Sequence, residues 1–174
     1  MWAAVLRMPG ALVLAEKSVP AVGPGQAVIR VATALIGEED LAIFEGDPPV
    51  ESGLTLGWRG AGIVEELGEG VRRFRPGDRV LVDSAMPALR GEENAVTNGL
   101  HAEYALIRHA DLTLIGIPDG LSDEWALILA GGLSPAHFPT HTLGLRDAAL
   151  GYAMMRSKPK GAVRVALKMN PRPS

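Results

Sequence analysis

The fold expected for this chain rests on one stretch, residues 57–83, which reads GWRGAGIVEELGEGVRRFRPGDRVLVD. Two segments of it, 60–67 and 79–83, are rich in aliphatic and β-branched residues, and we predict that both are strands. The run Arg75-Pro76-Gly77-Asp78 between them is typical of a tight turn, because proline presets the first central position and glycine tolerates a positive φ at the second. Short strands joined by tight turns predict a β-rich fold.

The same rhythm continues on both sides of this stretch. Short strands separated by Gly and Pro outnumber helical segments, which favours an all-β barrel or sandwich. A capping Ser122 followed by Asp123 and Glu124 marks the start of one of two predicted helices. Further strands are predicted at residues 2–7, 12–17, 27–34, 102–107, 112–117 and 162–168, and helices at 122–130 and 145–156.

The periodicity of the last two elements predicts which side chains face the core. The second helix carries an apolar face formed by Leu145, Ala148, Ala149, Tyr152 and Met155. In the final strand, apolar Val163, Val165 and Leu167 alternate with Arg164, Ala166 and Lys168. This alternation predicts a strand that is buried on one side only.

Composition narrows the class of protein. Hydrophobic residues make up 47% of the 174 residues and charged residues 21%, which is typical of one globular domain. The net charge of −3 and the lack of basic runs argue against a nucleic-acid partner. With no Cys there is no disulfide and no thiolate metal site. No apolar stretch is long enough to cross a membrane, and no signal peptide is recognisable, so a cytoplasmic location is expected.

Five blocks in order make this chain resemble the medium-chain dehydrogenase/reductase superfamily of alcohol dehydrogenases and quinone oxidoreductases. They are residues 57–83, already quoted, GPGQAVIRV at 23–31, DLAIFEG at 40–46, LHAEYALI at 100–107 and IPDGLSDEWALILA at 117–130. The resemblance is to the GroES-like catalytic domain, and it implies a mainly β, partly open barrel with two or three helices.

The same resemblance suggests how the chain is organised. Residues 1–130 resemble the N-terminal catalytic part, and residues 140–169 resemble the helix and strand that end the family's sequences. Residues 131–139 would then be a join where the family has its nucleotide-binding Rossmann domain, removed by nature or by engineering. We therefore expect a single GroES-like domain over residues 1–174.

No cofactor-binding residues are predicted. A dinucleotide site needs a strand, a G-x-G-x-x-G turn and a helix N-terminus, and that glycine pattern does not occur in the sequence. The spacing of Gly57, Gly60 and Gly62 is G-x-x-G-x-G, which opens a strand instead. We expect no βαβ unit that could hold a nicotinamide cofactor.

No metal ligands are predicted either. The resemblance places Gly37 at the Cys that binds the catalytic zinc in the family, and Gly57-Trp58-Arg59 at the family's Gly-His-Glu. Trp donates only an N–H and Arg carries a positive charge, so neither suits zinc. The family's structural zinc uses four Cys, and residues 84–99 contain none. His137 and His141 are four apart, but Pro139 between them opposes a helical pair.

One region is a candidate for ligand binding, a cleft inherited from the family. Its expected residues are Gly37, Glu38, Glu39, Asp40, Phe44, Trp58 and Arg59. Trp58 and Arg59 would form an aromatic and cationic pocket for an anion or a planar ligand. In the other interpretation Trp58 fills the former zinc cavity, Arg59 pairs with Glu38 or Glu39, and the acidic run is a solvated loop.

Two functions remain open on this evidence. The first is an alcohol-dehydrogenase-like protein without zinc ligands or a cofactor domain, non-catalytic, acting through binding or vestigial. The alternative is a zinc-independent NAD(P)H-dependent oxidoreductase resembling quinone oxidoreductases, which would borrow a nucleotide-binding domain from another chain. No catalytic residues are assigned, because no nucleophile–base pair is visible. His101 and His109 are expected at strand edges, where they are either structural or exposed. A homodimer is expected through the uncovered face around Phe44, Trp58 and residues 133–138.

Overall fold

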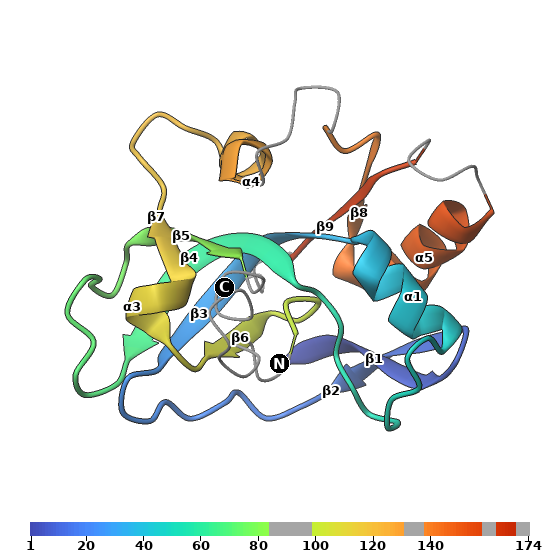
Figure 1. Ribbon diagram of the computed structural model, residues 1–174, viewed down its shortest axis with the longest axis horizontal. Coiled ribbons are helices and arrows are strands. Elements are labelled where there is room, and N and C mark those ends of the chain that lie inside the picture. Colours follow the sequence, from blue (N-terminus) through green and yellow to red (C-terminus); the bar gives the residue numbers. More distant parts are fainter. Residues whose placement is uncertain (84–98, 131–137, 158–162, 170–174) are drawn as a thin grey trace.

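The computed structural model describes residues 1–83, 99–130, 138–157 and 163–169. Its main sheet follows the path β7-β5-β4-β3-β9-β8, with β6 also paired to β3, and a separate hairpin joins β1 to β2 (Figure 1). The strands are β1 (Trp2–Met8), β2 (Ala11–Glu16), β3 (Ala27–Leu35), β4 (Arg59–Leu67), β5 (Arg79–Asp83), β6 (Tyr104–Ile107), β7 (Leu114–Gly116), β8 (His141–Gly144) and β9 (Val165–Lys168). The helices are α1 (Glu38–Glu45), α3 (Ala110–Thr113), α4 (Asp123–Ala130) and α5 (Ala148–Arg156).

Strand β3 is the centre of the main sheet. It pairs antiparallel with β4 along its length, with β6 over Ala27–Arg30 and with β9 over Thr33–Leu35. Its apolar, β-branched sequence suits this place, because most of its side chains are buried. The mainly β fold predicted from the sequence is confirmed, and within the described residues the sheet stays open between β7 and β8.

Two predictions of local structure are wrong near the middle of the chain. Residues 112–117 are not one strand, because the short helix α3 precedes β7. The acidic run at Glu38 is not a loop but the first turn of α1, where carboxylates are favoured by the unpaired N–H groups of the helix end. Helix α1 then ends at Gly46, whose φ of +100° is the left-handed conformation that glycine adopts most easily.

The C-terminal elements also differ in burial from the pattern. Ala149 is exposed, although Leu145, Ala148 and Tyr152 of the same predicted face are buried. Ala166 is only 1% exposed, so β9 is buried on both sides and not on one. The reason is position, since β9 lies inside the sheet between β3 and β8, and helix α5 packs against it. The turn expected near Lys158 lies outside the described residues.

The C-terminal elements also form a topological unit that the sequence analysis did not predict. Strands β8 and β9 pair in parallel and are connected through α5, so the described residues do contain a βαβ unit. Its first turn holds one glycine, Gly144, and Asp147 precedes the first residue of α5. A carboxylate at that end of the helix disfavours a phosphate, so the unit lacks the features of a dinucleotide site.

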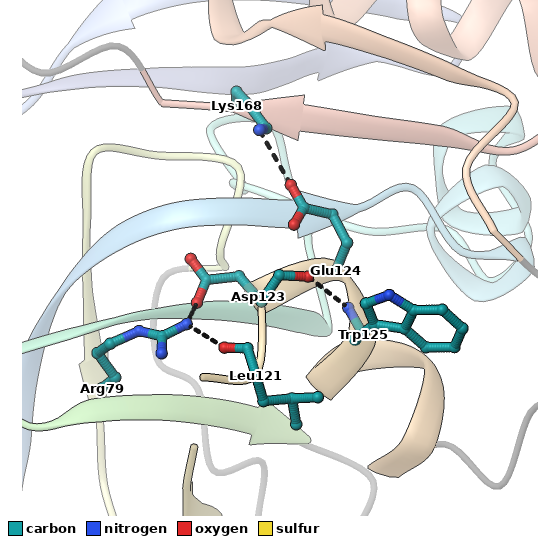
Figure 2. Close-up of polar contacts among 7 residues, drawn as sticks. Arg79, Leu121, Asp123, Glu124, Trp125 and Lys168 are labelled. Carbon is teal, nitrogen blue, oxygen red and sulfur yellow. Dashed lines mark hydrogen bonds and ion pairs between the residues drawn. The ribbon is translucent and has the colours of Figure 1, made fainter. Parts of the chain in front are cut away.

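Helix α4 is fixed to the sheet by charged contacts at its start (Figure 2). Arg79 of β5 donates to the carboxylate of Asp123 at 2.5 Å and to the carbonyl of Leu121 at 2.8 Å. Lys168 of β9 pairs with Glu124 at 2.9 Å. The predicted cap is confirmed, because the Ser122 hydroxyl accepts the backbone N–H of Trp125.

The inner face of α4 adds an apolar contact to these polar ones. Ala126 and Leu127 pack against Ala61, Leu81 and Ile117. An eight-residue helix has little stability in isolation, so these contacts determine both its place and its persistence.

We predict that Arg79→Met lowers the free energy of unfolding by about 1–2 kcal/mol, because it leaves two oxygens at the start of α4 without their donor. Arg30→Met is the matched control, since Arg30 pairs with Glu65 on the exposed surface of the sheet. The Arg79 and Asp123 side chains are 35% and 26% exposed, against 46% and 47% for the control pair. The control should therefore cost about 0–0.5 kcal/mol. Urea unfolding of both variants measures the difference, and equal costs would contradict the proposed anchoring.

Candidate functional site

Asp40 joins two distant parts of the chain. It is the third residue of α1 and is only 1% exposed. One carboxylate oxygen accepts the backbone N–H of Gly37 at 2.9 Å, and the other accepts that of Gly57 at 2.7 Å. The first bond closes the start of α1, and the second ties this helix to the turn that precedes β4.

The environment of Asp40 contradicts the solvated loop expected from the acidic run. Glu38 and Glu39 are exposed as expected, but the helix turns Asp40 inward. Burial raises the pKa of Asp40 above its ordinary value, and the nearby His101 and the two N–H donors oppose that rise. Both oxygens are already used by the backbone, so Asp40 serves the fold and does not face a ligand.

Gly57 occupies a position that only glycine fits. Its φ is +108°, and an added Cβ would lie 2.7 Å from the backbone nitrogens of Leu100 and His101. Those two N–H groups donate to the carbonyls of Gly57 and Leu56, respectively. The turn is therefore held from one side by Asp40 and from the other by the segment before β6.

His101 is completely buried, and both of its ring nitrogens have partners. Nε2 lies 3.1 Å from the carbonyl oxygen of Leu35, and Nδ1 lies 3.1 Å from the hydroxyl of Tyr152. Because a carbonyl only accepts, the Nε2 proton donates to Leu35, and we assign the bare Nδ1 as the acceptor of the Tyr152 proton. Of the two readings of His101 from the sequence, structural or exposed, the structural one applies.

Tyr152 brings α5 into this cluster. The centroid of its ring lies 4.8 Å from the ring centroid of Phe44 and 5.8 Å from that of His101. Burial and the negative charge of Asp40 raise the pKa of Tyr152 well above its ordinary value, so the hydroxyl keeps its proton. The sequence analysis placed Tyr152 on an apolar helix face and did not predict its contact with His101. The only signal for that contact is the hydroxyl group, which needs a hydrogen-bond partner when it is buried.

Phe44 does not line an open cleft. It is 3% exposed and belongs to the same core cluster as Leu56, Leu100 and Tyr152. The expected uncovered apolar face around Phe44 is therefore wrong for this residue, because α5 covers it. The homodimer remains a prediction, and residues 133–137 of the surface expected for it lie outside the described residues.

Trp58 and Arg59 are both half-buried and follow the Gly57 turn directly. Trp58 packs against the main core cluster, which agrees with an indole that fills space. Arg59 begins β4 and lies opposite Leu35 of β3 in the ladder. The proposed pairing of Arg59 with Glu38 or Glu39 stays a prediction.

The comparisons with known proteins agree on one family. The family model described as "Alcohol dehydrogenase GroES-like domain" matches residues 23–119. The chain belongs to this family. An alcohol dehydrogenase from Cupriavidus necator is 32% identical to this chain over 160 residues, covering 74% of this chain and 44% of the relative.

A solved structure and a second relative extend the likeness. The zinc-dependent alcohol dehydrogenase 2 from Streptococcus pneumonia, in its apo form, matches with a TM-score of 0.66 and 31% identity over 89% of this chain and 53% of that one. The NADP-dependent isopropanol dehydrogenase of Thermoanaerobacter brockii is 28% identical over 87% of this chain and 48% of the relative. The chain thus spans about half the length of the relatives it matches.

The polar residues around Gly57 are a poor set of ligands for a zinc ion. Gly37 has no side-chain donor, and Trp58 and Arg59 offer only N–H groups. Asp40 and His101 lie nearby, but their oxygens and nitrogens are used by the backbone and by Tyr152. In the part of the chain that the structure describes, no three His, Asp or Glu side chains gather as a metal would need. This donor set does not fit zinc.

The other histidines considered as ligands lie away from Gly57 in the sequence. His141 lies exposed on β8, where its Nδ1 is 2.9 Å from the Thr140 hydroxyl, and His137 is outside the described residues. None of the helices in the described ranges has the length and apolarity needed to span a membrane.

We predict that Tyr152→Phe flattens the loss of stability at alkaline pH. A raised pKa in the folded state means that the tyrosine's contribution is complete below about pH 10, the ordinary tyrosine value, and is lost as pH rises through the folded-state value. The free energy of unfolding of the unmodified protein should therefore fall more steeply above pH 10 than that of the variant.

The matched control for this experiment is Tyr104→Phe, which removes the hydroxyl of the other of the chain's two tyrosines. It should keep the steep slope of the unmodified protein. Identical slopes for the unmodified protein and for Tyr152→Phe would show that the buried hydroxyl is not the group concerned.

Proposed function

We propose that this GroES-like domain acts by binding and not by zinc-dependent turnover. The observation that carries the proposal is the state of the polar groups around Gly57. The side chains at positions 37, 58 and 59 offer no lone pair to a metal, because Gly37 has no side chain and Trp58 and Arg59 carry only N–H groups. The carboxylate oxygens of Asp40 and the ring nitrogens of His101 are already hydrogen-bonded within the fold. These residues therefore provide no ligands that could hold a metal ion as a Lewis acid.

The contact proposed for a ligand is the Trp58–Arg59 pair. An indole can stack on a flat ligand and a guanidinium can pair with its charge, so these two consecutive residues suit a planar anion. Both side chains are half-buried, so their interaction with such a ligand is less screened by solvent than on an open surface. An aromatic carboxylate is the simplest probe with this chemistry.

The test uses benzoate and two arginine variants. Benzoate binding, followed by chemical-shift changes of the Trp58 indole, should weaken by about tenfold in Arg59→Met, because a charge-assisted hydrogen bond is lost. Arg72→Met is the matched control, since Arg72 is exposed and contacts Asp111 through its backbone. It should leave the affinity unchanged.

Two further measurements separate this proposal from the enzymatic alternative. The purified protein should contain less than about 0.1 zinc per chain, and a chelator should not change its melting temperature. NADH and NADPH should show no binding at micromolar concentrations. One tight zinc per chain, or oxidation of NADH with a panel of aldehydes and quinones, would favour the oxidoreductase and overturn the binding proposal.

A further inference from the structure

We infer that His101 and Tyr152 are positioning residues that hold the Trp58–Arg59 pair in place, an inference that rests on the ligand contact proposed above. The first step is the contact between the His101 ring and Gly57. A Cβ added to Gly57 would lie 2.8 Å from Cδ2 of that ring, so the imidazole edge lies directly against the residue before Trp58. If the His101 ring rotated, its edge would move into this turn or away from it.

The second step is the bond from the His101 ring to β3. Its Nε2 donates to the carbonyl of Leu35 at 3.1 Å, and Leu35 is the residue opposite Arg59 in the β3–β4 ladder. The same imidazole therefore contacts the residue before Trp58 and bonds the strand partner of Arg59. The His101 side chain thus contacts the backbone on both sides of Trp58 and Arg59, at Gly57 and at Leu35.

The third step is the orientation of that imidazole, which depends on Tyr152. The Tyr152 hydroxyl donates to Nδ1 at 3.1 Å and so leaves the Nε2 proton for Leu35. Tyr152 itself is held by its ring contact with Phe44 of α1, and α1 and α5 lie side by side (Figure 1). Helix α5 thus reaches the Trp58–Arg59 turn through two buried side chains, although it follows Trp58 by about ninety residues in the sequence.

The tautomer of His101 provides a direct test in the unmodified protein. Nitrogen-15 shifts of the histidine side chains should show a protonated Nε2 and a bare Nδ1 for His101. A protonated Nδ1 on His101 would overturn the inference. This measurement does not depend on any variant being folded or on any ligand binding.

A second test follows the three tryptophan indole N–H signals, with that of Trp58 assigned by its loss in Trp58→Phe. Tyr152→Phe should shift the Trp58 signal and weaken benzoate binding about fivefold, while the Trp125 signal on α4 stays in place. Tyr104→Phe should change none of these. A folded Tyr152→Phe with an unmoved Trp58 signal would overturn the inference, whereas failure of benzoate to bind the unmodified protein would overturn only the proposed ligand contact.

Discussion

The carboxylate of Asp40, shared between the backbone N–H groups of Gly37 and Gly57, is the interaction on which the rest of the structure depends. A buried carboxylate is costly unless its oxygens are satisfied, and here each oxygen has an amide donor. The bond to Gly37 starts α1, and the bond to Gly57 sets the turn that leads into β4. Because β4 pairs with the central strand β3, an error at this turn would propagate into the main sheet.

The buried polar cluster of Asp40, His101 and Tyr152 is closed on itself. Asp40 bonds the backbone, His101 bonds Leu35 and Tyr152, and the Tyr152 ring packs on Phe44. Fully satisfied buried networks of this kind fix one arrangement of a core, and they leave no donor set for an ion. The same closure explains why the proposed function depends on the half-buried Trp58 and Arg59, which directly follow Gly57 in the sequence, and not on the cluster itself.

The sequence predicted well what local chemistry determines. The start of α4 follows from the Ser122 cap, and the central β3 from its run of β-branched residues. It failed where distant residues decide the outcome. The buried Asp40 accepts a hydrogen bond from Gly57, which lies 17 residues further along the chain. The buried His101 is hydrogen-bonded to Tyr152, which lies 51 residues away. No periodicity in the chain records either pairing.

Amide hydrogen exchange at Gly57 tests this account most directly. The Gly57 N–H lies in a turn, outside any strand ladder, and donates to the buried Asp40 carboxylate. If Asp40 fixes the turn, this amide should exchange only on global unfolding, as slowly as the amide of Val64 within β4. It should exchange at least about a hundredfold faster in Asp40→Ala, while Glu39→Ala, at an exposed site, keeps the protection. A Gly57 amide that exchanges within seconds in the unmodified protein would contradict the account.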